Sequence, residues 1–233
     1  MNNILIGFIM ISATLFLSLS GESKSYFQMH SFFLVIGGTF SILIFSTPGG
    51  VLKSLYRNII NLFKREDSIA KFKDEILIIS EKRNKSPKSK HLFIAYAQEL
   101  WIQGIDPDLF VVLISQKKNE IESPLIDSVH ALKNLAKYPP TLGMTGTVMG
   151  MINLFSSLDT KKDSIGISLS IAMTATFMGL ILANILISPL ADRLHIRQIN
   201  QQRIIQNMYE LLLLINQGEP SALIKEELNE RAV

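Results

Sequence analysis

The sequence contains no cysteine, one tryptophan and only four histidines among its 233 residues. Without cysteine the chain can form neither a disulfide nor a thiolate metal site. His30, His91, His130 and His195 are scattered along the chain, so we predict no metal centre and no cofactor. The net charge is only +3, and the basic residues form no patch with interleaved aromatics, which argues against nucleic-acid binding.

Charge is also missing from four long apolar runs, although 48% of the chain is hydrophobic and the mean hydropathy is +0.28. A helix needs about 20 residues to cross the hydrocarbon core of a bilayer. The runs are residues 4–20, 32–47 (extended by 27–31), 139–157 and 165–191. We therefore predict an all-α membrane protein with four transmembrane helices. The first run could instead be a signal peptide, but no Lys or Arg precedes it and a second run follows closely.

The placement of positive charge predicts the orientation. Lys53, Arg57, Lys64 and Arg65 follow the second run, and Arg193, Arg197 and Arg203 follow the fourth, whereas the charges in the two other loops cancel. By the positive-inside rule, both termini and the large middle segment are cytoplasmic. The predicted domains are transmembrane helices 1 and 2 (1–47), a cytoplasmic helical domain (48–138), transmembrane helices 3 and 4 (139–191) and cytoplasmic C-terminal helices (192–233).

Helical periodicity predicts the structure of the cytoplasmic parts. Apolar residues recur at helical spacing at Ile69, Phe72, Ile76 and Ile79, and again at Leu92, Ala95 and Leu100. Residues 104–108 predict a helix stop and a new N-cap, and residues 218–220 predict a break in the tail. The basic run 82–90 is either a solvated linker near anionic lipid headgroups or a docking surface for an acidic partner.

The run 139–157 is too rich in glycine and threonine for a simple lipid anchor. Pro140, Gly143, Thr147, Gly150 and Leu154 share one helical face. The fourth run has a matching face of small residues: Ala172, Thr176, Gly179 and Ala183, beside a ladder of Ala175, Gly179 and Ala183. Such faces let helix backbones approach closely, and ordinary helix packing, with threonines bonded to their own helix, is the simplest interpretation.

The functional alternative is an ion pathway. Counted from the cytoplasmic ends of their runs, Thr147 lies about 12 Å deep and Thr176 about 22 Å deep, so both hydroxyls fall near the midplane. None of the four runs contains Asp, Glu, Lys or Arg, whereas ion relays in membranes use an ionisable group. Either the chain moves no ions, or a second protein supplies the carboxylate.

Short motifs that lie in order along the chain resemble those of the flagellar stator A-subunit family, the MotA/PomA type, within the MotA/TolQ/ExbB superfamily. The motifs are Val35-Ile36-Gly37-Gly38-Thr39-Phe40, Gly104-Ile105-Asp106-Pro107-Asp108, Pro140-x-x-Gly143-Met144-x-Gly146-Thr147-x-x-Gly150, Ala172-Met173-x-x-Thr176-x-x-Gly179, Leu182-Ala183-Asn184, Ser188-Pro189-Leu190-Ala191, and Gly218-Glu219-Pro220 with Ile224 and Leu228. Together they extend over nearly the whole chain.

The resemblance implies a non-enzymatic channel subunit of the bacterial inner membrane. It implies a ring of five such chains around two copies of a single-span MotB-type partner. The partner's aspartate carries the ion, and the ring of five chains turns a FliG-type rotor protein. Pro140 and Pro189 match the family's coupling prolines, and Thr147 and Thr176 match pore-facing positions. We add Thr145, Gly150 and Ala175 to the expected ion pathway. Ala175 stands where sodium-type members carry threonine, which favours protons over Na⁺.

Arg83 and Glu99 are the candidate rotor-facing charges, although the basic run after Arg83 departs from the family pattern. That departure keeps a second function open, a TolQ/ExbB-like energiser of another cell-envelope machine. A third interpretation is a passive membrane scaffold.

Overall fold

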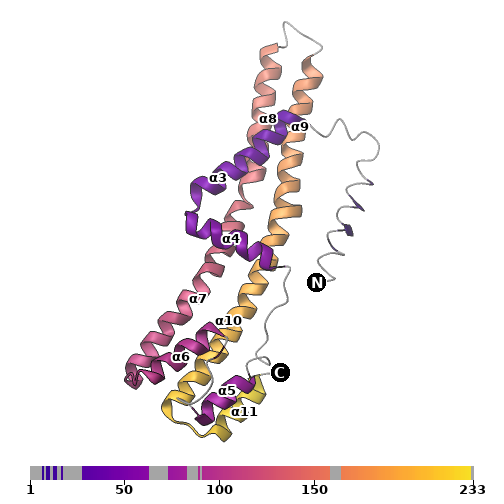
Figure 1. Cartoon of the computed structure of the whole chain (residues 1–233). Helices are drawn as coiled ribbons and strands as arrows, with labels where there is room; N and C mark the ends of the chain where they lie inside the picture. Colours follow the sequence, from indigo (N-terminus) through magenta and orange to yellow (C-terminus); the bar gives the residue numbers. More distant parts are fainter. Residues whose placement is uncertain are drawn as a thin grey trace. The chain divides into compact units, whose positions relative to one another are not determined.

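The computed structural model describes residues 28–62, 73–82, 89, 91–157 and 164–231, together with Gly7, Ile9, Met10, Ala13, Thr14 and Leu17. Every regular element in these ranges is a helix (Figure 1). The chain divides into two compact units, one made of Met1–Phe63 and Asp127–Leu194 and the other of Lys64–Ile126 and His195–Val233. Most of the first predicted span, residues 4–20, lies outside the described residues.

The first unit is built from long apolar helices. An apolar rod is made of α2 (Met29–Phe32), the π-helix η1 (Phe33–Gly37) and α3 (Gly38–Ser46). It leads through Pro48 into α4 (Gly49–Asn61). The rod packs against two further helices, α8 (Tyr138–Ser157) and α9 (Ser164–Ile181), which run side by side in Figure 1. The π-helix η4 (Leu182–Ile187) joins α9 to α10 (Ser188–Gln217).

Two described helical stretches are long and apolar enough to cross a membrane, namely Met29–Ser46 and a window within Ile165–Gln217. They correspond to the second and fourth predicted spans. The third predicted span forms the continuous helix α8, but it does not reach the same apolarity because glycine and threonine take the place of larger side chains.

The π-helix η4 is explained by the proline that follows it, Pro189. Pro189 lacks a backbone N–H, so the carbonyl of Ile185 loses its usual helical donor, and the proline ring crowds that carbonyl. A π-turn over Leu182–Ile187 widens the helix just before this position, and the N–H of Ser188 bonds the carbonyl of Ala183. The helix therefore continues past the proline instead of ending there.

The second unit is held together by one apolar core. Its helices are α5 (Lys73–Lys82), α6 (Leu92–Ile102), the greater part of α7 (Pro107–Leu135), most of α10, and α11 (Ser221–Arg231). The fully buried members of the core include Ile76, Ile79, Phe93, Ile94, Ala97, Phe110, Ile114, Ile205, Met208, Leu211, Leu212 and Ile215. Ile76 and Ile79 confirm the predicted face of α5; Ile69 and Phe72 lie outside the described residues.

The predicted inward face of α6 is wrong by one position. Leu92 is 63% exposed and Ala95 is half-buried, whereas Phe93, Ile94 and Ala97 are fully buried. Only Leu100 of the predicted set lies in the core. The apolar residues of α6 surround the helix, so periodicity alone cannot choose between two neighbouring faces.

Both predicted helix breaks are confirmed. Gly104 has φ of 68°, a left-handed conformation that favours glycine, and Asp106 then caps α7 by accepting a hydrogen bond from the Asp108 N–H at 3.1 Å. The α6–α7 turn is fixed by Trp101, whose ring stacks on the ring of Phe110 with 5.1 Å between the ring centroids. In the tail, α10 ends before Gly218, whose φ is 85°, and α11 begins after Pro220.

The two compact units divide the chain by packing and not by the predicted membrane boundaries. Residues 48–63 and 127–138, which we predict to be cytoplasmic, pack with the apolar helices of the first unit. The reason is local packing: Ser128 near the end of α7 lies 3.1 Å from the Ser54 hydroxyl of α4 and accepts a hydrogen bond from the Asn58 amide at 3.0 Å.

Glu122 is an acidic side chain held between α7 and α10 in the second unit. Its Oε1 atom is buried without a hydrogen-bond partner. Burial raises the pKa of this carboxyl above its ordinary value, and the Lys118 charge and the Gln202 hydrogen bond offset the rise only in part. A group whose folded pKa is raised adds stability at low pH and loses that contribution as the pH rises through the folded pKa.

We therefore expect Glu122→Gln to stabilise the protein at neutral pH, with a rise in melting temperature of about 2 °C. The difference from wild type should shrink as the pH falls toward the ordinary range of a carboxyl group, where Glu122 is itself neutral. Differential scanning fluorimetry of the detergent-solubilised chain at several pH values measures this. An exposed acid on α6, Glu99, provides the control, because Glu99→Gln removes the same charge without relieving burial.

Candidate functional site

The contact between α8 and α9 is made by small residues on both helices. A Cβ atom built on Gly143 would lie 2.8 Å from the carbonyl oxygen of Ala175, and one on Gly150 would lie 2.6 Å from the Cβ of Ala172. A Cβ on Gly146 would collide with the Cβ of Ala175. Three glycines of α8 thus allow its backbone to lie directly against α9, as the small-residue faces predicted.

The same close approach extends along the unit. A Cβ on Gly179 would run into the carbonyl oxygen of Pro139 and lie 3.3 Å from the Cα of Pro140. On the rod, Gly38 meets the side chain of Leu142, whose Cδ1 would lie 2.9 Å from an added Cβ. The backbone contacts at Gly143 and Gly179 therefore leave no room for a larger side chain, whereas at Gly38 only the flexible end of Leu142 would have to move.

The threonines use their hydroxyls in two ways. Thr176 donates a hydrogen bond across the helix contact to the carbonyl oxygen of Gly143, at 3.3 Å. Thr147 and Thr145 instead bond carbonyls of their own helix, Met144 O at 2.6 Å and Thr141 O at 3.0 Å. Thr147 is half-buried and Thr145 is exposed, so one lone pair of each hydroxyl oxygen could still accept a further bond.

The depths predicted for the two threonines need correction. They were measured from Pro139 on one helix and Ala191 on the other, but the carbonyl of Pro139 lies against Gly179, twelve residues before Ala191. Measured from one level, that of the exposed Lys137, Thr147 lies about 15 Å along the helix and Thr176, opposite Gly143, about 9 Å. The two hydroxyls therefore lie at different levels, about 6 Å apart along the helix axis.

The two predicted coupling prolines lie apart. Pro140 belongs to the α8–α9 contact beside Gly179, whereas Pro189 follows η4, ten residues further along. That separation is about 15 Å along a helix. Of the other predicted pathway residues, Gly150 and Ala175 are buried in the helix contact itself and present no polar side chain.

Sequence reasoning missed a polar belt between α2 and α9. Gln28 donates a hydrogen bond to the Ser170 hydroxyl at 2.9 Å, and the buried Ser31 donates to the carbonyl oxygen of Ile171 at 3.0 Å. The sequence feature that could have predicted this belt is a polar residue near the edge of each apolar run. These bonds fix the far end of the rod on α9, away from the charged end of the unit.

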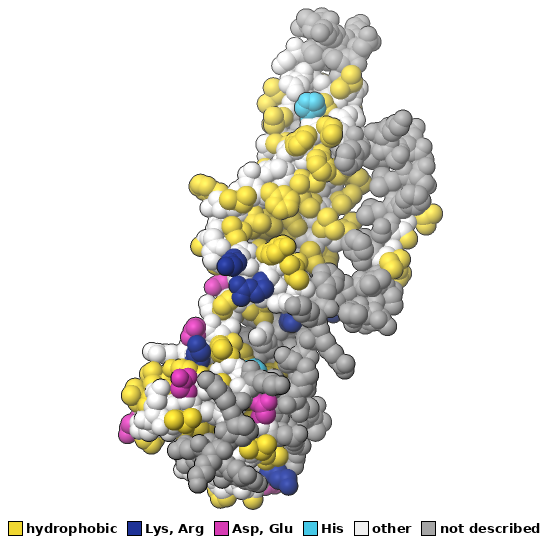
Figure 2. All heavy atoms as spheres, viewed as in Figure 1, with side chains coloured by type: hydrophobic (Ala, Val, Ile, Leu, Met, Phe, Trp, Pro, Cys, Tyr) yellow, Lys and Arg dark blue, Asp and Glu magenta, His cyan; other side chains and the backbone are white. Residues whose placement is uncertain are grey.

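The described parts of the rod, α8, α9 and η4 carry no Asp, Glu, Lys or Arg. Figure 2 shows the corresponding band of hydrophobic side chains, with Lys and Arg gathered at one edge of it. Among the described residues, no group of three His, Cys, Asp or Glu could hold a metal ion. The arrangement offers hydroxyls and carbonyls in an apolar setting but no proton carrier of its own.

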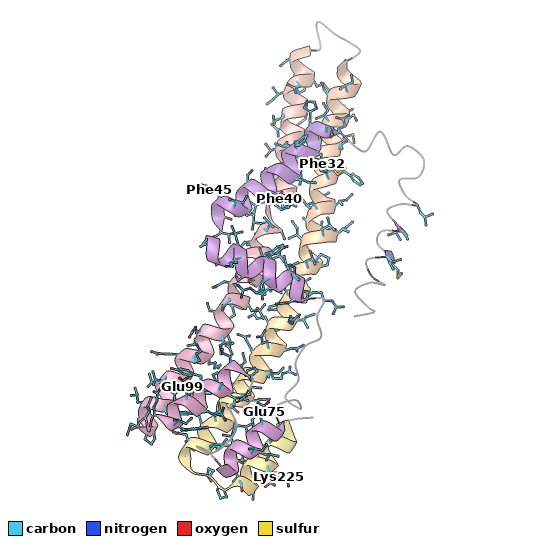
Figure 3. The ribbon with its side chains drawn as sticks, viewed as in Figure 1. Phe32, Phe40, Phe45, Glu75, Glu99 and Lys225 are labelled. Atoms are coloured by element: carbon cyan, nitrogen blue, oxygen red, sulfur yellow. The ribbon has the colours of Figure 1, made fainter. Side chains whose placement is uncertain are left out.

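Of the two candidate rotor-facing charges, Glu99 lies among the described residues and Arg83 does not. Glu99 is exposed on α6 in the second unit, where Figure 3 labels it. Arg83 lies outside the described residues. The basic run 82–90 also lies almost entirely outside them.

The fold and the site together define a helical membrane protein whose apolar helices are packed backbone to backbone through small residues. A family model described as the MotA/TolQ/ExbB proton channel family matches residues 84–207, just over half of the chain. The chain belongs to this family, and it is therefore a channel subunit and not an enzyme, as expected.

Individual relatives agree over almost the full length. The chain is 24% identical over 215 residues to Motility protein A of Borreliella burgdorferi, covering 87% of this chain and 82% of that protein. It is 27% identical over 236 residues to chemotaxis protein PomA of Vibrio alginolyticus, covering 91% and 88%.

Solved structures show the same fold. The C. jejuni MotAB structure matches with a TM-score of 0.82 and 16% identity, covering 97% of this chain and 94% of the matched chain. The flagellar MotAB stator complex of Bacillus subtilis matches with a TM-score of 0.76 and 20% identity, covering 95% and 92%.

We expect Gly179→Ala to destabilise the protein by about 1–3 kcal/mol, because the added methyl would press on the backbone of Pro139, which has no flexible end to move aside. Gly166→Ala is the matched control on the same helix, since nothing lies within 4 Å of its added Cβ. Thermal unfolding in detergent should show a lower midpoint for the first variant and an equal or higher one for the second. Equal midpoints would contradict the contact.

Proposed function

We propose that the chain is the A-type stator subunit of a flagellar motor, which converts ion flow into torque. The observation that carries the proposal is the charge-free, close-packed pair α8 and α9 with hydroxyls of Thr147 and Thr176 along it. Such a pair can line a path for an ion but cannot carry one. Relatives named Motility protein A and matched structures of MotAB complexes support the flagellar role.

In this proposal the chain crosses the bacterial inner membrane four times, with both termini in the cytoplasm. Five copies surround two copies of a MotB-type partner, each with one membrane helix and an aspartate that carries the ion. Thr147, Thr176 and Thr145 solvate the ion, while Gly150 and Ala175 keep the helices close. Glu99 and Arg83 face a FliG-type rotor protein.

We propose a proton as the ion. Ala175 stands where the resemblance gives sodium-type members a threonine, and its side chain is buried in the α8–α9 contact, so it offers no oxygen that could replace the water shell of Na⁺. A proton needs no such shell, because it can pass between hydrogen-bonded oxygens. Swimming that persists in sodium-free medium and stops with a proton uncoupler supports this assignment, and the opposite pattern refutes it.

A second candidate function is favoured by the breadth of the matching family, which includes TolQ and ExbB. In that case the chain would energise a different envelope machine. The partner encoded beside it separates the two: a single-span protein with a membrane aspartate and a peptidoglycan-binding domain indicates a stator. Imaging the purified complex of the chain with that partner tests the ring of five around two.

Replacement of Pro140 tests the coupling role. We expect Pro140→Ala to leave the ring assembled but to abolish swimming, because the residue lies where the α8 backbone contacts Gly179 of α9. Pro124→Ala, in helix α7 of the second unit, is the control and should leave swimming intact. Size-exclusion chromatography and a swimming assay give the two readouts; unaltered swimming of the Pro140 variant would exclude the role.

The hydroxyl of Thr176 provides a separate test. With the partner present, we expect Thr176→Val to reduce proton flux into vesicles about tenfold, since an isosteric apolar group can neither bond Gly143 nor solvate a proton. Thr176→Ser restores the hydroxyl and should recover most of the flux. If valine and serine variants conduct alike, the pathway does not pass Thr176.

A further inference from the structure

The helix α4 presents an exposed basic stripe that packing among the described residues of the first unit does not use. Lys53, Tyr56, Arg57 and Ile60 occupy positions i, i+3, i+4 and i+7, so they share one face. All four are exposed, and Tyr56 is 70% exposed. We call these four residues the α4 stripe.

The opposite face of α4 fixes the helix in place. Leu55 is buried, and the side chains of Ser54 and Asn58 bond the Ser128 hydroxyl of α7 at 3.1 and 3.0 Å. These contacts set the rotation of α4 about its axis. The α4 stripe must therefore face away from the rest of the unit.

The chain connectivity places α4 at the membrane boundary. The apolar span Met29–Ser46 ends three residues before α4 begins at Gly49. The polar headgroup layer is about 5–7 Å thick on each side of the hydrocarbon core, and Lys and Arg side chains reach a comparable distance. The α4 stripe consequently starts within reach of lipid headgroups.

The charge at this end of the unit is complementary to anionic lipid. The described charged side chains of the first unit all lie at the end marked by α4, as Figure 2 shows for one face. They comprise five cations, Lys53, Arg57, Lys133, Lys137 and Arg193, against two acids, Asp127 and Asp192. The helix α4 itself contains no acidic residue that could neutralise Lys53 or Arg57.

We propose that the α4 stripe is a binding surface for the headgroups of anionic phospholipids in the leaflet that it borders. Arg57 bonds phosphate oxygens through its planar fork, and Lys53 acts as a point charge beside it. Tyr56 occupies the interfacial position that tyrosine prefers, and Ile60 contacts the first methylenes of the acyl chains. The proposal needs only a membrane span and α4, so it stands or falls separately from the stator role.

Native mass spectrometry of the full chain, released from detergent supplemented with phosphatidylglycerol or phosphatidylcholine, tests this surface. Wild type should retain phosphatidylglycerol in preference to phosphatidylcholine. Because each cation near an anionic surface contributes about a fivefold preference, Lys53→Gln with Arg57→Gln should lower the preference roughly tenfold or more. Arg203→Gln with Lys225→Gln is the matched control, since it removes two exposed cations from the second unit.

Three outcomes would overturn the proposal. Wild type could retain both lipids equally, the control pair could lose as much phosphatidylglycerol as the α4 pair, or excess inorganic phosphate could displace the lipid. The last result would mean that the stripe binds free phosphate and not a membrane surface. Circular dichroism of both double variants checks that a loss of lipid does not reflect loss of the helices.

Discussion

The backbone contact between α8 and α9 is the constraint on which the rest of the first unit depends. In lipid there is no hydrophobic driving force between helices, so close van der Waals packing must hold them. Gly143, Gly146 and Gly150 make that packing possible because even one added carbon would meet α9. The bond from Thr176 to the Gly143 carbonyl is a consequence, since a hydroxyl on a short side chain can cross only a contact this close.

This contact also decides which faces remain for function. The small residues are buried in the contact between the two helices. The exposed residues of α8 therefore include Thr141, Met144 and Thr145, and those of α9 include the apolar Met173 and Leu180. A helix face that carries hydroxyls can line a polar path without charged side chains, whereas a purely apolar face suits contact with lipid. Phe40 and Phe45 on α3, labelled in Figure 3, extend the apolar exterior of the unit. In the proposed function, the ion carrier comes from another chain.

Local features were predictable from the sequence, whereas the relative position of helices was not. The glycine and alanine faces follow from spacing alone, and the breaks at Gly104 and Gly218 follow from glycine's access to positive φ. The levels of Thr147 and Thr176 depend on how α9 slides along α8, which no single helix encodes. Whether Leu92 or Phe93 of α6 is buried likewise depends on which face of the helix its neighbours cover.

The π-turn η4 explains how a rigid contact and a proline can coexist in one continuous helix. The close packing against α8 includes Gly179, which the Pro139 carbonyl holds in place, and η4 begins three residues later. A π-turn and a proline both weaken the regular hydrogen-bond ladder, so bending is easiest between Leu182 and Pro189. Gly179, which lies beside Pro140 of α8, and Pro189 therefore flank the segment of this helix that bends most easily without breaking the α8–α9 contact.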